Sequence, residues 1–227
     1  MIRRVEVAWP DARPFAARGG RPIRMLAASD ELDPALDHPR NRAELGELDL
    51  VVGCGDLEPD YLAFLGDAFG VPLLHVRGNH DRGIAWGTAE RIVPEALPDG
   101  RIVEEASLSV AGLSWPGPAD GRAVRDDLGA WRQVLPLALR AVRRPPLLVL
   151  SHVPPRGLGD DLHDPFHAGF GAYRWLLERA RPPLWLHGHT HCRPSRDRVE
   201  RHGRTTLVNV TGAVLVELRP PGRVLRP

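Results

Sequence analysis

Five short polar motifs follow apolar runs along the chain. Each run has the length and composition of a buried strand, so each motif is expected where a strand ends. In open α/β sheets ligands bind beyond the carboxyl ends of the strands, where such motifs can converge. Their Asp, Asn and His side chains would together form a mixed nitrogen and oxygen site for a divalent metal. In chain order the motifs are Ser29-Asp30, Gly55-Asp56, Gly78-Asn79-His80-Asp81, Ser151-His152 and Gly188-His189-Thr190-His191.

Each motif alone has a simpler interpretation, as a buried histidine or an aspartate in a turn. All of them together, in this order and each after a strand-like run, argue against that interpretation. The two cysteines, Cys54 and Cys192, lie beside the motifs. Because free cysteine is among the most buried residue types, burial is favoured over metal ligation for both.

The order of the motifs resembles that of the calcineurin-like metallophosphoesterases, whose pattern is DxH, GDxxD, GNH(D/E), a lone H and GHxH. The resemblance runs from about Ile23 to Leu218. Leu32 stands where the family pattern has its first histidine, and Asp60 lies one position beyond the later Asp of the second motif. The stretch HVPPRGLGDDLHDPFHAGF is similar to a bacterial subgroup that lacks the first histidine, so the departure is interpreted as a subgroup trait.

The resemblance implies two divalent cations bridged by Asp56. One cation would also take Asn79, His152 and His189. The other would take Asp30 and His191, with water, Glu31 or Asp33 replacing the imidazole lost at Leu32. A site with fewer nitrogen ligands favours manganese or magnesium over zinc, and manganese is the expected metal, with iron, zinc or magnesium as alternatives.

The resemblance also assigns His80 to protonation of the leaving oxygen, with Asp81 orienting its ring. The alternative is that His80 only holds Asp56 or Asn79 in place.

The segment Pro154–Gly169 follows His152 directly, so it is expected to border the site and to influence substrate choice. Within it, Arg156 is a candidate phosphate contact. A third metal at His163 and His167 is less favoured than a solvated polar loop.

Trp115 lies outside that segment. It is interpreted as an aromatic wall of the site or as a core residue.

The coarse pattern predicts a βαβ unit followed by antiparallel strands. It indicates an α/β fold, the four-layer α-β-β-α sandwich of two mixed sheets that the resemblance also implies. A single domain over 1–227 is expected, with 1–22 as an N-terminal extension and the core over 23–218. The expected strands are 4–8, 23–28, 48–54, 71–76, 101–105, 108–113, 147–150, 184–187, 205–210 and 213–218, and the expected helices are 59–69, 126–144 and 170–181, the second kinked or split at Pro136.

Composition excludes several classes of function. The net charge is +1, which gives no basis for binding a long nucleic acid. There is no lysine, so Schiff-base chemistry and a P-loop lysine are excluded. No apolar run is long enough to span a membrane, and the N-terminus has no secretory h-region, so a cytoplasmic location is expected.

The leading hypothesis is a metal-dependent phosphohydrolase that cleaves a small phosphodiester or phosphomonoester by attack of a metal-activated water. A nuclease, a non-catalytic scaffold and a nucleotide sensor on the same fold remain as alternatives. The sequence does not predict the oligomeric state.

Overall fold

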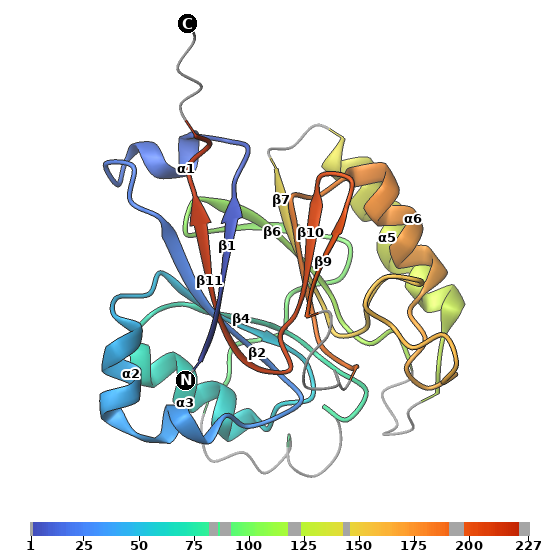
Figure 1. Cartoon of the computed structure of the whole chain (residues 1–227). Helices are drawn as coiled ribbons and strands as arrows, with labels where there is room; N and C mark the ends of the chain where they lie inside the picture. The colour runs from blue at the N-terminus through green and yellow to red at the C-terminus, as the bar shows by residue number, and fades with distance from the viewer. Residues whose placement is uncertain are drawn as a thin grey trace, which may run out of the picture.

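The computed structural model describes residues 2–81, 86, 92–117, 124–142, 146–190 and 198–222. Within them, two β-sheets pack face to face and helices cover the outer face of each sheet (Figure 1). The predicted α-β-β-α sandwich of two mixed sheets is confirmed.

The first sheet has five strands in the order β1-β11-β2-β3-β4. Its strands β2, β3 and β4 are parallel, β11 is antiparallel to β2, and β1 pairs in parallel with β11 at the edge. Parallel strands buried on both faces are rich in Val, Leu and Ile, as here. The bounds are β1 Arg3–Ala8, β2 Ile23–Ser29, β3 Leu50–Cys54, β4 Leu73–Val76 and β11 Gly212–Arg219.

The second sheet has six strands in the order β5-β6-β7-β8-β10-β9. The four inner strands are parallel, and β5 and β9 run antiparallel at the two edges. The bounds are β5 Ile102–Glu105, β6 Leu108–Leu113, β7 Leu147–Ser151, β8 Leu184–His187, β9 Val199–His202 and β10 Thr205–Asn209.

Helices α2 (Pro39–Leu45) and α3 (Pro59–Phe69) cover the first sheet, and α5 (Asp127–Ala141) and α6 (Gly171–Ala180) cover the second (Figure 1). Two further helical turns are short, α1 at Arg13–Ala16 and η1 at Pro34–Asp37. Pro136 lies inside α5, which continues as one helix through it, so the predicted split does not occur.

Three hydrophobic clusters separate the layers. The central one lies between the sheets, and alternate residues of the same strands face the helices on either side, as the period of a strand requires. Trp9 and Phe15 are buried in the central cluster. The segment expected as an N-terminal extension therefore supplies both an edge strand and core side chains. Among the described residues, no helix has the length and apolar character needed to cross a membrane.

Candidate metal centre

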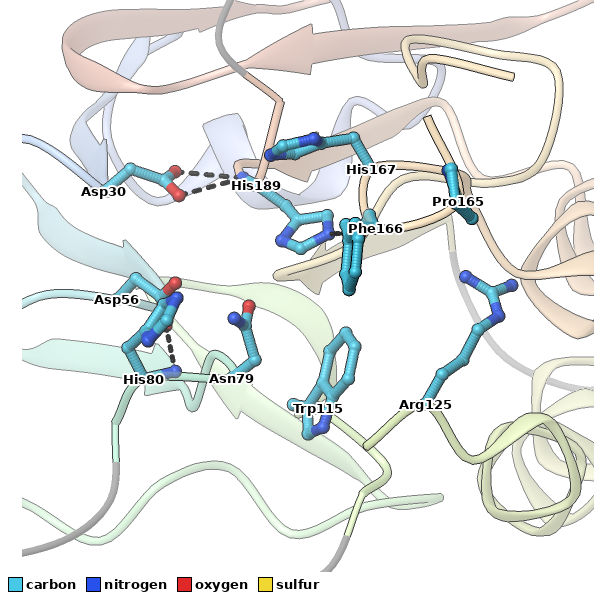
Figure 2. A pocket seen from close by; sticks show the side chains of 10 residues that line it. All are labelled: Asp30, Asp56, Asn79, His80, Trp115, Arg125, Pro165, Phe166, His167 and His189. Carbon is cyan, nitrogen blue, oxygen red and sulfur yellow. Dashed lines mark hydrogen bonds between the residues drawn. The ribbon is translucent and has the colours of Figure 1, made fainter. Parts of the chain in front are cut away.

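The predicted ligands come together because both sheets present their strand ends at one place. Asp30, Asp56 and Asn79 follow β2, β3 and β4, which are adjacent and parallel in the first sheet. His152 and His189 follow β7 and β8, which are adjacent and parallel in the second. Side chains from two sheets therefore converge on one cavity of about 760 Å³ (Figure 2).

Three of these residues have left-handed backbone conformations, which are uncommon outside glycine. The φ angles are 61° at Asp30, 54° at Asp56 and 68° at His189. Each residue lies one or two positions after a strand end. Such conformations cost about 1–3 kcal/mol each and cluster at functional sites, because surrounding contacts must maintain them.

Two motif glycines permit the close approach of the strand ends. A Cβ at Gly78 would overlap with Oδ1 of Asp56, and a Cβ at Gly188 would overlap with Ser29 Oγ and Asp30 Oδ2. The GNH and GH motifs therefore need glycine for steric reasons, apart from any role of the following residues in chemistry.

The His152 ring is at the centre of the cluster. Its Nε2 lies 2.9 Å from Asn79 Oδ1, 3.2 Å from Asp56 Oδ2 and 3.1 Å from His189 Nδ1. Its Nδ1 is 2.9 Å from the carbonyl oxygen of Cys54, an acceptor, so Nδ1 carries the proton. In the neutral ring Nε2 then presents a lone pair toward the other three atoms.

His189 has the matching arrangement. Its Nε2 lies 2.7 Å from the carbonyl oxygen of Phe166 and donates to it, which leaves the Nδ1 lone pair facing His152. Lone pairs that face each other repel unless a proton or a cation lies between them. Two ligands about 2.1 Å from a cation and at right angles lie about 3.0 Å apart, close to the observed separations. The donor set of Asp56, Asn79, His152 and His189 therefore fits a divalent cation.

The pKa shifts indicate that a proton and a cation compete for the position between His152, His189 and Asp56. Burial disfavours the charged His152 ring, but the charge and hydrogen bond of Asp56 outweigh it and raise the pKa of His152 to about 9. Burial, together with the charge of His152, lowers the pKa of His189 to about 4. Without a cation, His152 Nε2 carries a proton and donates it in a hydrogen bond to the Asp56 carboxylate. A bound cation would replace that proton.

Asp30 lies beside the same cluster. Its carboxylate accepts hydrogen bonds from the His189 backbone amide, at 2.9 Å, and from the Thr211 hydroxyl, at 3.1 Å. Ligand atoms of Asp30, Asp56 and His152 lie within 4.8 Å of one another, so these residues form a candidate metal-binding group. His191, the remaining predicted ligand, and Cys192 lie outside the described residues.

The comparisons with known proteins agree with this arrangement. The model of a family described as calcineurin-like phosphoesterase matches residues 45–193. The chain belongs to this family. No curated protein matches the sequence.

Solved structures show the same fold at low sequence identity. One is TT1561 of Thermus thermophilus, at 21% identity with a TM-score of 0.55 over 84% of this chain and 90% of that one. Another is GAP50, titled the anchor in the inner membrane complex of Plasmodium, at 13% identity with a TM-score of 0.50 over 84% of this chain and 72% of that one.

Leu32 departs from the family pattern and lies at the surface. It is 55% exposed in the loop after β2. Asp33, one of the groups expected to replace the missing imidazole, caps η1 instead, because its Oδ1 accepts a hydrogen bond from the Ala35 amide. In this structure the Asp33 carboxylate thus stabilises the start of η1. Glu31 is exposed.

Asp81 has a different place from the one predicted. Its Oδ2 accepts hydrogen bonds from the backbone amides of Asp56 and Gly78, both at 2.8 Å. Within the described part of the chain, no hydrogen bond joins Asp81 to the His80 ring. The expectation that Asp81 orients His80 is therefore corrected: Asp81 fixes the turn that carries Asp56. Burial raises the pKa of this carboxyl group to about 6.

His80 lines the cavity and is exposed, with its ring close to Asp56 (Figure 2). Its backbone amide donates to Asp56 Oδ1 at 2.8 Å. The backbone of His80 thus holds Asp56, and its side chain stays accessible to a bound substrate.

The segment 154–169 borders the cavity as expected, through Pro165, Phe166 and His167. Arg156 is exposed and does not line the cavity, so its predicted phosphate contact has no support. Arg125 lines the cavity instead and donates to the carbonyl oxygens of Ala168 and Gly169.

Two predictions about neighbouring side chains have mixed outcomes. Among the described residues, His163 and His167 belong to no group of three potential metal ligands, and His167 pairs with Asp164.

Trp115 is only 6% exposed and packs on Phe170. It also lines the cavity, so it is both a core residue and part of the cavity wall.

Sequence patterns do not reveal the contacts of Thr211, Arg125 and the Phe166 carbonyl group. The Phe166 contact is made by the backbone, which carries no residue-type signal. Thr211 follows β10 and lies far along the chain from Asp30. The only sequence feature that could have indicated its place at the site is that it follows a strand.

Proposed function

We propose that this chain is a metal-dependent phosphohydrolase that cleaves a small phosphodiester or phosphomonoester by attack of water. The observation that carries the proposal is the cluster of His152 Nε2, His189 Nδ1, Asp56 Oδ2 and Asn79 Oδ1 in a member of the calcineurin-like phosphoesterase family. His189, Asp56 and Asn79 line an open cavity, and His152 is buried behind them.

Each residue has a separate role in the proposal. Asp56, Asn79, His152 and His189 would hold one cation, and Asp30, Asp56 and His191 would hold the second. Bound divalent cations lower the pKa of water and neutralise phosphoryl oxygens, which an anionic ester needs for attack. Manganese is the proposed metal because the described ligands of the second cation, Asp30 and Asp56, are oxygens.

His80 is proposed as the group that protonates the leaving oxygen. Its ring is exposed in the cavity beside Asp56, so a substrate bound there is within its reach. Imidazole titrates near neutral pH and suits proton transfer under those conditions.

The proposal is tested by hydrolysis of bis-p-nitrophenyl phosphate and p-nitrophenyl phosphate with added Mn²⁺. Asn79→Ala and His189→Ala should abolish turnover while circular dichroism shows an intact fold. His202→Ala, at the end of β9 and away from the cavity, is the matched control and should keep full activity. Near-normal turnover by either site variant in metal-free buffer would overturn the assignment.

A non-catalytic scaffold is the second candidate, and Leu32 is the observation that favours it. A protein that lacks one ligand could retain the fold and use its surface for partners. The accessible His80 ring opposes this candidate, because a scaffold has no need for a proton donor in the cavity. Absence of turnover with every metal tested, combined with tight binding of Mn²⁺, would favour the scaffold.

A further inference from the structure

We propose that the cavity accepts an ester with a flat aromatic group next to the phosphate, and that the Phe166 side chain binds this group. The inference deepens the proposed function and rests on it. It concerns the side of the cavity away from the carboxylates, which the hydrolytic roles above do not use.

Phe166 is exposed within a candidate active site. It lines the cavity, and it is 78% exposed. Large apolar groups left in water at a concave site mark a place for an apolar ligand, because covering them removes unfavourable hydration. Leu162, on the same loop, is 58% exposed but does not line the cavity.

The backbone places Phe166 close to the metal centre. Its carbonyl oxygen is 2.7 Å from His189 Nε2, and His189 Nδ1 is 3.1 Å from His152 Nε2. The backbone of Phe166 is therefore hydrogen-bonded directly to one of the proposed metal ligands, His189.

The cavity has two chemically different sides (Figure 2). Asp30, Asp56, Asn79 and His80 lie on one side, and the rings of Phe166 and Trp115 lie on the other. Aromatic rings pair with centroids about 4.5–7 Å apart in stacked or edge-to-face geometry. A flat ring entering beside Phe166 would gain such a contact, whereas a polar alkyl group would leave the phenyl ring in water.

Binding of non-hydrolysable probes tests the inference without turnover. The first pair is phenylphosphonate and methylphosphonate, and the second is the 5′-methylenephosphonate analogues of adenosine 5′-monophosphate and ribose 5-phosphate, each titrated by calorimetry into the Mn²⁺-loaded protein. In at least one pair the aromatic member should bind about 10-fold more tightly, equivalent to about 1.4 kcal/mol. Preference in the first pair alone indicates a small aryl group, and preference in the second indicates a nucleobase.

Phe166→Ala should remove that preference. The change keeps the backbone carbonyl group, so the hydrogen bond to His189 is retained and the affinity for methylphosphonate should stay the same. Phe166→Tyr should keep the preference, and Leu162→Ala is the matched control on the same loop. Equal binding within both pairs, or a preference that survives Phe166→Ala, would overturn the inference.

The two proposals fail in different ways. If the protein prefers the aromatic probes but hydrolyses no ester, the hydrolase proposal fails and the role of Phe166 in binding an aromatic group is retained. If it hydrolyses esters but binds both members of each pair equally, only the role of Phe166 fails.

Discussion

His152 joins three of the other proposed ligands through one nitrogen atom. Its Nδ1 is held by the Cys54 carbonyl group, so the direction of Nε2 is set by the end of β3, a strand of the opposite sheet. The ring is fully buried, and its position does not depend on solvent. Proton and cation therefore compete for a single, fixed lone pair, and this competition has a measurable pH dependence.

We expect the metal-free protein to lose stability as the pH rises from 6.5 to 9. The pKa of His152 is raised from 6.5 to about 9 in the folded state, so its stabilising effect is complete below pH 6.5 and is lost as the pH passes 9. The effect is on the order of 3 kcal/mol at about 1.36 kcal/mol per pKa unit. Urea unfolding in chelator at pH 6 and pH 9 measures it.

His152→Asn provides the comparison for that experiment, because the variant has no ring to titrate. Its free energy of unfolding should change much less between the two pH values. An equal change in both proteins would show that the pH dependence comes from another group.

His80→Ala should slow esters with poor leaving groups by about 10²–10⁴-fold and activated esters much less. The backbone amide of residue 80, which holds Asp56 Oδ1, is unchanged in the variant, so the loss reports on the ring alone. Rates on nitrophenyl and alkyl esters give the comparison. A uniform loss on both would assign the ring to positioning.

Leu32→His should tighten the second, oxygen-rich metal site by roughly 10- to 100-fold, the scale on which metal-site partners act. Leu32 is exposed, so the change disturbs no core packing. Calorimetric titration with Mn²⁺ should give one tight and one weak site for the unmodified protein and two tight sites for the variant. Two equal, tight sites in the unmodified protein would mean that another residue already replaces the lost imidazole.

At the scale of the elements, the turns after the strands position the ligands, and the motif glycines allow those turns. Gly188→Ala would place a Cβ against Ser29 and Asp30, and should lower Mn²⁺ affinity and turnover at least 10-fold. Gly171→Ala, at the start of α6, is the matched control, because its Cβ would have no atom within 4 Å. Full activity in Gly188→Ala would show that the turn tolerates a shift of Asp30.

The elements that could be predicted are those with an unambiguous local pattern. Pro59–Phe69 combines proline at a helix start with apolar spacing, and Leu184–His187 is a short apolar run, and both predicted bounds match the structure. The sequence does not predict Val199–His202, because it is an edge strand with alternating exposed residues and no apolar face. It does not predict Pro39–Leu45 either, because that helix is short and mostly polar.

In the candidate site, too, only the features with a local sequence pattern could be predicted. Residue types at strand ends predict the grouping of Asp30, Asp56, Asn79, His152 and His189. The role of Asp81 could not be predicted, because two backbone amides compete successfully for its carboxylate. The place of Arg125 depends on how the segment 160–169 folds back over the cavity, which has no local pattern.

At the scale of the whole molecule, the packing of two sheets creates the site. The central cluster between the sheets, which includes Trp9 and Phe15 from the N-terminal segment, holds their strand ends together. Neither sheet alone contains a complete ligand set, since the carboxylates and Asn79 follow the first sheet and the two histidines follow the second. Loss of packing between the sheets should therefore weaken metal binding before it unfolds either sheet.

The central claim is that His152, His189, Asp56 and Asn79 hold one divalent cation. The most direct measurement is a crystal structure of the Mn²⁺-loaded protein with anomalous diffraction at the manganese edge. The expected result is a strong peak about 2.0–2.3 Å from His152 Nε2, His189 Nδ1, Asp56 Oδ2 and Asn79 Oδ1, with a weaker peak between Asp30 and Asp56. No peak among those four atoms at saturating Mn²⁺, or a single strong peak elsewhere, would contradict the claim.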